Sequence, residues 1–403
     1  MRTNAMRSVS RLGLGAAALC VAAALMQPAS AVPVFARKYG FNCTMCHSAF
    51  PRLNDFGLRY RRNGYRIPGR ENLEKLVYET PTPLAMRTSV GYNSETFSNT
   101  PETTNVAEFQ LNGLDMLSAG LLGRNIGYFM VYTPQIAAGR GVAGQDGALE
   151  AANVVLSSPR STWFYARLGR FEPAYVPFSV KRSLTVASYE IYDFAFPGGP
   201  PFADTRTGVE ITGWGDPGIR YAAGLIDGSD TNSASDSPAD MYLRLEKVIG
   251  AGEGQTAGHR IGLTGYRGLA RPESGASPRK SFTRVGADAS MNVGIWNLGV
   301  QYLHGEDNRE LWGTAENVKF DGGFAELLCH PRTDLVAFAR YDWVDTPSSV
   351  RMGVNRWTVG GRYYLEDSVA VHLEYSHRTQ SPIQTGLGHA TERLFTARVD
   401  FAL

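Results

Sequence analysis

The chain has 403 residues, of which 43% are hydrophobic, and a formal net charge of +2 at pH 7. This balance excludes a disordered chain, and it excludes a nucleic-acid-binding protein, which would carry a marked excess of basic residues. Glycine is abundant, with 44 residues, and aromatic residues make up 11% of the chain. That composition is typical of many short strands with aromatic girdles.

Residues 1–31 have the features of a cleaved signal peptide. Arginines precede a short apolar run at 12–26, and Ala29-Ser30-Ala31 matches the small-residue pattern of a cleavage site. We therefore expect an exported chain that begins near Val32, with Cys20 removed together with the signal. No later apolar run reaches the length of about 18 residues that a spanning helix needs.

Residues 43–47 read Cys-Thr-Met-Cys-His, a complete C-x-x-C-H motif for haem attachment. A zinc site would need a second ligand pair at finger-like spacing, and a redox dithiol would need a βαβ context. Neither is present, since Cys329 is a single cysteine. We predict one covalent haem c, attached through Cys43 and Cys46, with His47 as the proximal iron ligand.

A short helix should follow this motif. Ser48 is a candidate N-cap, Phe50-Pro51 suits a helix start, and Asn63-Gly64 suits a helix end. One apolar stripe of this helix would cover a haem edge, although it would equally suit an ordinary core face. The stripe consists of Leu53, Phe56 and Tyr60.

The segment 32–70 is strongly basic, with Asp55 as its single acidic residue. We expect one or two of its cationic side chains to bind haem propionates and the others to face solvent or acidic residues of a pore. These are Arg37, Lys38, Arg52, Arg59, Arg61, Arg62, Arg66 and Arg70. The distal iron ligand stays open. Met86 is the first residue that could reach the far face, and the alternatives are a ligand from later in the chain or an empty position.

From residue 85 to 403 the pattern changes to an alternation of apolar and polar residues. In the last strand Phe395, Ala397 and Val399 fall on one face, and Thr396 and Arg398 fall on the other. Apolar-out, polar-in strands of this kind predict an all-β fold, a transmembrane outer-membrane β-barrel, behind a small N-terminal α-helical haem c segment. We expect about 16 strands, near 85–92, 105–118, 123–132, 149–157, 162–171, 206–213, 217–226, 239–248, 258–267, 281–291, 293–303, 315–328, 333–343, 354–364, 368–377 and 391–402.

The connections between these strands alternate between long and short, as in barrels with external loops and periplasmic turns. A soluble β-sandwich, the alternative fold, would not explain this alternation. Among the long loops, 93–104 is the first and 172–205 is the longest. The latter is rich in Tyr and Phe, so we expect either an external lid or a segment folded into the pore, unless it is an inert surface loop.

Other polar residues give weaker signals. Two acidic clusters in long loops would suit a hard divalent cation, or they are simply solvated. The clusters are Asp227, Asp230 and Asp236, and Glu306, Asp307 and Glu310. Of the histidines after His47, we expect only His372 on a lumen-facing strand position.

The segment 32–66 resembles the fused monohaem cytochrome–porins of iron-oxidising bacteria. The resemblance is carried by Val34-Phe35-Ala36-Arg37, the haem motif, Phe50-Pro51-Arg52-Leu53-Asn54-Asp55-Phe56-Gly57 and Asn63-Gly64-Tyr65, and in the barrel by Gly169-Arg170-Phe171-Glu172-Pro173. It implies one haem c at the inner mouth or in the lumen of the barrel, held by Cys43 and Cys46 with His47 as ligand. It also implies that electrons pass from extracellular ferrous iron to a periplasmic carrier.

Together these features divide the chain into a signal peptide (1–31), a monohaem cytochrome c segment (32–80) and a porin-like barrel (85–403). We expect an outer-membrane protein in contact with lipid, with its N-terminus in the periplasm or the barrel lumen. The favoured function is an electron conduit that takes electrons from an extracellular donor such as Fe(II) to a periplasmic cytochrome. The enzyme class that fits it is an electron-transfer oxidoreductase of the Fe(II) oxidase or cytochrome c reductase type. The alternative is a diffusion porin whose haem segment serves as a plug, anchor or sensor.

Overall fold

The structure is a computed structural model that describes residues 38–41, 43–49, 51–67, 75–80, 83–99, 102–158, 161–215, 218–228, 240–250, 258–272, 278–381 and 389–402. The predicted signal peptide and Val34-Phe35-Ala36-Arg37 lie outside these residues. Within them, no helix is long and apolar enough to cross a lipid bilayer.

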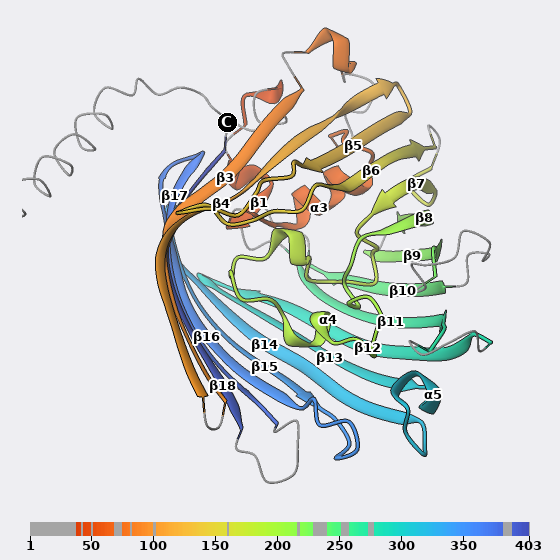
Figure 1. Ribbon diagram of the computed structural model, residues 1–403. Coiled ribbons are helices and arrows are strands. Elements are labelled where there is room, and N and C mark those ends of the chain that lie inside the picture. The colour runs from red at the N-terminus through yellow and green to blue at the C-terminus, as the bar shows by residue number, and fades with distance from the viewer. Residues whose placement is uncertain are drawn as a thin grey trace, which may run out of the picture.

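Sixteen antiparallel strands form a closed barrel (Figure 1). Consecutive strands pair in chain order, and β18 pairs with β3 to close the ring, with Val399 opposite Val90. The strands are β3 (Leu84–Asn99), β4 (Glu102–Gly123), β5 (Ile126–Thr133), β6 (Ala148–Ser157), β7 (Tyr165–Phe171), β8 (Arg206–Gly215), β9 (Ile219–Ile226), β10 (Asp240–Ile249), β11 (His259–Ala270), β12 (Lys280–Val293), β13 (Trp296–Asp307), β14 (Val318–Arg332), β15 (Leu335–Asp345), β16 (Val354–Glu366), β17 (Val369–Gln380) and β18 (Ala390–Ala402). The predicted number and order of strands are confirmed.

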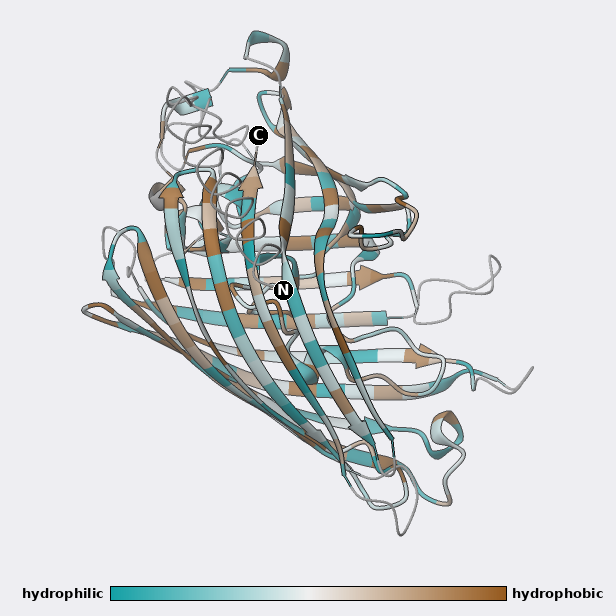
Figure 2. Cartoon of the chain, turned by 60° about the vertical axis from the view of Figure 1, so that its left-hand side comes forward, coloured by the Kyte–Doolittle hydropathy of each residue, from teal (hydrophilic) through white to brown (hydrophobic). Residues whose placement is uncertain are grey.

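Alternation along each strand sorts the side chains between lipid and lumen. On β10, Met241 and Leu243 are 51% and 50% exposed, whereas their neighbours Tyr242 and Arg244 are buried. Figure 2 shows the same alternation as hydrophobic and hydrophilic bands along the strands. Because every backbone group of a closed sheet is paired within the sheet, such a barrel can present a largely apolar outer face to lipid.

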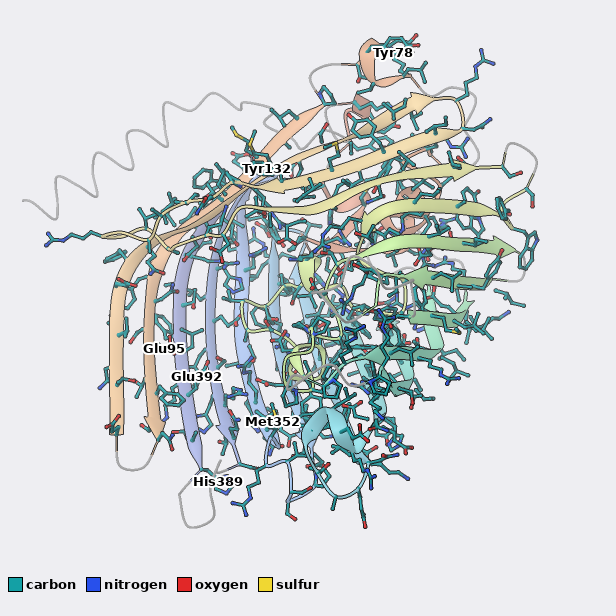
Figure 3. All side chains as sticks on the ribbon, turned by 45° about the vertical axis from the view of Figure 1, so that its right-hand side comes forward. Tyr78, Glu95, Tyr132, Met352, His389 and Glu392 are labelled. Carbon is teal, nitrogen blue, oxygen red and sulfur yellow. The ribbon has the colours of Figure 1, made fainter. Side chains whose placement is uncertain are left out.

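The two ends of the barrel differ in their connections. The short-turn end carries the turns 124–125, 294–295, 333–334 and 367–368, and the long-loop end carries 134–147, 172–205 and 308–317. Figure 3 shows Tyr78 at the short-turn end and His389 at the long-loop end. β3 begins and β18 ends at the short-turn end.

The prediction of a long loop at 93–104 is wrong. Residues 84–99 and 102–123 continue as β3 and β4, joined through 100–101, with Glu95 opposite Val106. Side chains such as Thr96 and Asn105, whose Oγ1 and Oδ1 atoms are 2.8 Å apart, make this hairpin polar on its outer face as well. Without an apolar face, the paired strands resemble a loop in the sequence.

The long connection 172–205 folds into the lumen. Of the expected arrangements, the segment folded into the pore is therefore confirmed, and the external lid is wrong. It contains η4 (Val180–Arg182) and α4 (Glu190–Asp193), and α4 packs on β14, β15 and β16. Tyr175 and Tyr192 are completely buried. The backbone nitrogens of Val186 and Ala187 donate to the Glu374 carboxylate of β17, each at 2.7 Å. We call residues 172–205 the lumen loop.

The N-terminal segment (the described residues of 38–80) places β1 and α3 in the lumen at the short-turn end (Figure 1). It contains η1 (Cys43–Met45), β1 (His47–Ala49), β2 (Arg52–Leu53), α3 (Asp55–Arg62) and η3 (Val77–Glu79). Arg62 pairs with Glu246 of β10 at 3.4 Å, and Arg52 pairs with Glu326 of β14. Ion pairs to the barrel wall therefore hold this segment inside the lumen.

The predicted start of the helix is wrong and its end is confirmed. Residues 47–53 form a small hairpin, in which His47 lies opposite Leu53, so Ser48 is not a cap. The cap is Asn54, whose side chain accepts from the backbone N of Gly57 at 2.9 Å. At the other end Asn63 is the C-cap, and Gly64 follows with φ of 65°.

Candidate haem site

The three residues predicted to hold haem border one cavity. Cys43 begins η1, Cys46 follows it and His47 begins β1. All three line a cavity of about 340 Å³ between the N-terminal segment and the barrel wall. This volume lies within the range of cofactor pockets. The Cys43 thiol donates to the backbone oxygen of Asp367 at 3.3 Å, which places the motif against a turn of the short-turn end.

Helix α3 and its N-cap pack against the backbone of the attachment motif. Asn54 links the two, because its backbone N donates to the Cys46 oxygen at 2.9 Å and its Nδ2 donates to the Met45 oxygen at 3.0 Å. Gly57 lies directly under the same carbonyl, and a Cβ atom there would be 2.2 Å from the Cys46 oxygen. The glycine thus permits the close approach of helix and motif.

Replacing Gly57 with valine should displace the motif. The added side chain overlaps the Cys46 carbonyl, and overpacking of this kind costs about 1–3 kcal/mol. We expect a lower covalent haem content per folded barrel, measured by haem absorbance against total protein. Gly265→Val is the matched control, because no atom lies within 4 Å of its added Cβ. Equal haem content in the two variants would show that the close packing of Gly57 is not needed.

The Pro51 carbonyl favours the His47 tautomer that carries its hydrogen on Nδ1. Its Nδ1 lies 3.0 Å from the Pro51 carbonyl oxygen, which can only accept, so Nδ1 carries the hydrogen. In the neutral ring Nε2 then carries the lone pair. In metal-ligating histidines, a hydrogen bond from the nitrogen that does not bind the metal orients the ring in the same way. Burial lowers the pKa of His47 to about 4, so the ring is neutral at physiological pH.

Both cysteines of the motif are neutral thiols. Burial raises the pKa of both Cys43 and Cys46 to about 11, and the charge of Asp367 contributes at Cys43. Among the described residues, no group of three or more His, Cys, Asp or Glu side chains is arranged to hold a metal ion. Cys43, Cys46 and Cys329 are all free of disulfides.

The walls of the cavity are largely apolar. The predicted stripe of Leu53, Phe56 and Tyr60 lines one side, as the sequence indicated. Ala119, Phe129 and Val131 of β4 and β5 also line it. A hydrophobic group in the cavity would therefore meet apolar surface from both the N-terminal segment and the barrel wall.

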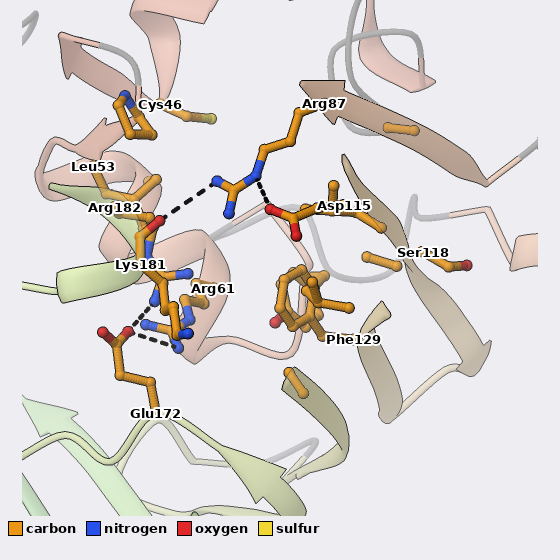
Figure 4. Close-up of a pocket in the computed structure, with 18 of the residues that line it drawn as sticks. Cys46, Leu53, Arg61, Arg87, Asp115, Ser118, Phe129, Glu172, Lys181 and Arg182 are labelled. Atoms are coloured by element: carbon orange, nitrogen blue, oxygen red, sulfur yellow. Dashed lines mark hydrogen bonds and ion pairs between the residues drawn. The ribbon is translucent and has the colours of Figure 1, made fainter. Parts of the chain in front are cut away.

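Charged side chains gather along the side of the cavity that faces the lumen loop (Figure 4). Arg61 of α3 and Arg182 of the lumen loop both pair with Glu172, Arg61 at 3.8 Å. Burial, together with the charges of Arg182 and Arg167, lowers the pKa of Arg61 to about 9. Added negative charge near Arg61 would therefore be stabilising.

We call this charged side of the cavity the charged rim. The lumen loop contributes more side chains to the charged rim than the sequence suggested. Lys181 lines the cavity and pairs with Glu150 at 2.5 Å. Its backbone oxygen accepts from Arg87 at 3.5 Å, and Arg87 also donates to Asp115 at 2.6 Å (Figure 4). The sequence marked Glu172 as the start of a long loop and as part of the stretch 169–173 that carries the resemblance, and nothing in it signalled Lys181 or Arg182.

Met86 is not positioned as a distal ligand. It borders the cavity, but it lies between Ala85, which is buried, and Arg87, which faces the lumen and donates to Asp115. Successive side chains on a strand point to opposite faces, so the Met86 side chain is directed to the outside of the barrel.

The other histidines lie away from this cavity. His372 is completely buried on the lumen face of β17, as predicted, where its Nε2 lies 3.1 Å from Glu374. His330 is also buried, which the sequence did not indicate. Among the described residues that line the cavity, His47 is the only histidine.

The acidic loop clusters do not form a cation site in the part of the chain that the structure describes. Asp307 pairs with Arg284, and Glu310 pairs with Lys280 at 3.0 Å. The Glu306 carboxylate accepts from Asn317 at 3.1 Å. Asp230 and Asp236 lie outside the described residues.

No family model and no curated protein matches the chain, but solved structures of outer-membrane proteins are similar to it. The anion-selective porin from Comamonas acidovorans has a TM-score of 0.58 and 11% identity, covering 79% of this chain and 99% of that one. The outer membrane channel DcaP of Acinetobacter baumannii has a TM-score of 0.57 and 10% identity, covering 79% and 97%. OmpF of Salmonella typhi, in complex with daunomycin, has a TM-score of 0.53 and 11% identity, covering 79% and 97%. The chain is a closed 16-stranded antiparallel barrel with the fold of the outer-membrane porins.

Proposed function

We propose that this chain is an outer-membrane electron conduit that carries one covalent haem c. It would take electrons from an extracellular donor, ferrous iron above all, and pass them to a periplasmic cytochrome. The observation that carries this proposal is the shared cavity of Cys43, Cys46 and His47, located in the lumen of a barrel built to cross a membrane.

The residues of the cavity fit a haem. Cys43 and Cys46 would form the thioethers, and His47 would ligate iron through Nε2 because Pro51 holds its Nδ1 hydrogen. Arg61 would attract the propionates. When bound, the haem supplies a one-electron iron centre whose potential depends on its axial ligand, burial and neighbouring charge.

The position of the cavity suits the delivery of electrons to the periplasm. In outer-membrane barrels the short turns face the periplasm, and the Cys43 thiol contacts the turn 367–368. A soluble carrier would thus approach the haem from the short-turn end, where Met45 of the motif is 44% exposed.

The alternative is a diffusion porin with the haem segment as plug, anchor or sensor. Only the fold of the similar structures favours it. The interior supports the conduit better. Both the N-terminal segment and the lumen loop occupy the lumen, and the buried core around Tyr175 and Tyr192 takes the space of a channel.

Ferrous iron should reduce the haem of the purified wild type, and His47→Ala should abolish this reduction. The substitution removes the iron ligand and leaves both thioether positions and all barrel strands intact. Stopped-flow absorbance of the haem bands after mixing is the measurement. His330→Ala is the matched control, since His330 is a buried histidine outside the cavity. A wild-type haem that ferrous iron leaves oxidised would remove iron as the donor.

A further inference from the structure

A second cavity lies where the N-terminal segment, the lumen loop and the barrel wall meet. It has a volume of about 90 Å³, and arginines from all three parts line it. These are Arg52, Arg61 and Arg62 of the N-terminal segment, Arg182 of the lumen loop, and Arg167 and Arg260 of the wall. We call it the arginine cavity, and we propose that it binds one small oxyanion, in the form of a carboxylate or a phosphate group.

Positive charge exceeds negative charge around the arginine cavity. In the part of the chain that the structure describes, four carboxylates pair with the six arginines. Glu172 pairs with Arg61 and Arg182, Glu210 with Arg167, Glu326 with Arg52, and Glu246 with Arg62 and Arg260. A surplus of two positive charges is left. Because a charge inside a protein is costly without a counter-ion, this surplus calls for a bound anion.

The next neighbours do not remove the surplus. Glu246 is also paired with Arg220 and Arg244, at 3.1 and 3.0 Å. Asp55 and Asp288 offset these two additional arginines, each with a contact of 2.6 Å. The wider network of ion pairs therefore keeps the same excess of cations as the cavity itself.

Two arginines of the cavity have unused hydrogen-bond donors. Within the described residues, the buried Nε atoms of Arg167 and Arg260 donate to no acceptor. Buried polar groups in folded proteins are nearly always hydrogen-bonded. These donors, like the charge surplus, are explained by a ligand with acceptor oxygens.

The arginine cavity has the size and the rigidity that a small anion requires. A cavity of about 90 Å³ holds a few water molecules, and so a phosphate or carboxylate group. The Phe178 ring packs against the guanidiniums of Arg52 and Arg260, which lie 5.3 and 5.4 Å from its centroid. The Phe171 ring holds Arg167 in the same way at 4.2 Å. Guanidiniums fixed in this manner bind carboxylate and phosphate oxygens in pairs.

Water screens these charges only weakly, because the six arginine side chains are between 12% and 21% exposed. Burial lowers the pKa of Arg62, as it does that of Arg61, and neighbouring arginines add to both shifts. A missing counter-ion produces pKa shifts in this direction.

Two sources would supply the same oxyanion chemistry. The arginine cavity adjoins the candidate haem cavity, because Leu53, Arg61, Glu172 and Arg182 line both. Figure 4 shows Arg61 and Arg182 together beside Glu172. A haem propionate would therefore reach both arginines from the haem cavity, and this source alone rests on the proposed function. Free inorganic phosphate is the other source and needs no haem.

Equilibrium dialysis against radiolabelled inorganic phosphate tests the site and separates the two sources. Two full-length proteins in detergent are compared, the haem-loaded wild type and Cys43→Ala/Cys46→Ala, which lacks covalent haem. One phosphate per chain on the haem-loaded protein would support a site for the free anion. One phosphate on the haem-free protein alone would support a site that the propionate fills. No such binding to either protein would overturn the oxyanion site and leave the electron conduit untouched.

Arg61→Met and Arg62→Met locate the bound phosphate. Neither change strands a carboxylate, because Glu172 keeps Arg182 and Glu246 keeps Arg220. We expect each to weaken phosphate binding at least about tenfold, which corresponds to about 1.4 kcal/mol. Of the two adjoining cavities, Arg62 lines only the arginine cavity, so its variant shows which of them holds the phosphate.

Arg59→Met is the matched control. Arg59 lies on the same helix α3 and pairs with Asp55 at 3.1 Å, and Asp55 keeps Arg220 when Arg59 is lost. The net charge of the chain changes by the same amount, but Arg59 does not line the arginine cavity. Its variant should bind phosphate like the parent protein. Equal phosphate affinity of the Arg59→Met and Arg62→Met variants would place the anion elsewhere and overturn the proposal.

Discussion

Replacing both Cys43 and Cys46 with alanine is expected to abolish covalent haem. Each thiol supplies one thioether, so either single variant should retain at most a singly attached haem. Haem staining of a denaturing gel is the measurement, since only covalently bound haem survives denaturation.

Cys329→Ala serves as the control for this experiment. Cys329 lies on β14, away from the cavity, opposite Trp296. Its loss should leave haem staining at the wild-type level. Full staining of the double variant Cys43→Ala/Cys46→Ala would show that haem is attached elsewhere, and the assignment of the motif would be wrong.

Removing the anchor of the lumen loop should open the barrel to ions. Arg340 is completely buried, pairs with Asp342 at 2.7 Å, and donates to the backbone oxygens of Ala187 and Ser188 at 2.8 and 2.6 Å. Arg340→Leu would leave the Asp342 carboxylate buried without its partner, a loss of about 3–5 kcal/mol. We expect the segment around α4 to loosen from the wall, because the Ala187 carbonyl loses its Arg340 contact and the Ser188 carbonyl keeps only Arg356, at 3.2 Å.

Single-channel conductance in planar bilayers measures this opening, and we expect a several-fold increase over the wild type. Arg332→Leu is the control, since Arg332 is highly exposed and its pair with Asp334 is a surface contact worth about 0–1 kcal/mol. If Arg340→Leu conducts no better than the wild type, the lumen loop does not restrict the passage of ions.

The strands could be predicted from the sequence because a barrel in lipid imposes one rule on every spanning strand. Phe395 and Val399 must meet lipid while Thr396 faces the lumen, and this demand is local to each strand. The rule no longer applies where both faces of a hairpin meet polar surroundings, as around Thr96 and Asn105. There the sequence suggested a loop, and cross-strand pairing decided the structure.

The site was predictable only in its local part. Cys43, Cys46 and His47 are close in sequence, so their common cavity follows from the spacing of the motif. The charged rim around Arg61 and Arg182 comes from segments more than a hundred residues apart, which no local pattern connects. The helix cap shows a similar limit, because Ser48 and Asn54 are both good caps and the hairpin at 47–53 selected Asn54.

Electron transfer across a sealed bilayer decides between a conduit and a porin. Liposomes carrying the haem-loaded protein enclose an oxidised soluble cytochrome, and a reductant that cannot cross the bilayer is added outside. We expect the wild type to reduce the enclosed cytochrome and His47→Ala to leave it oxidised. Equal reduction by both proteins would contradict the conduit, because it would show that the barrel admits the reductant itself.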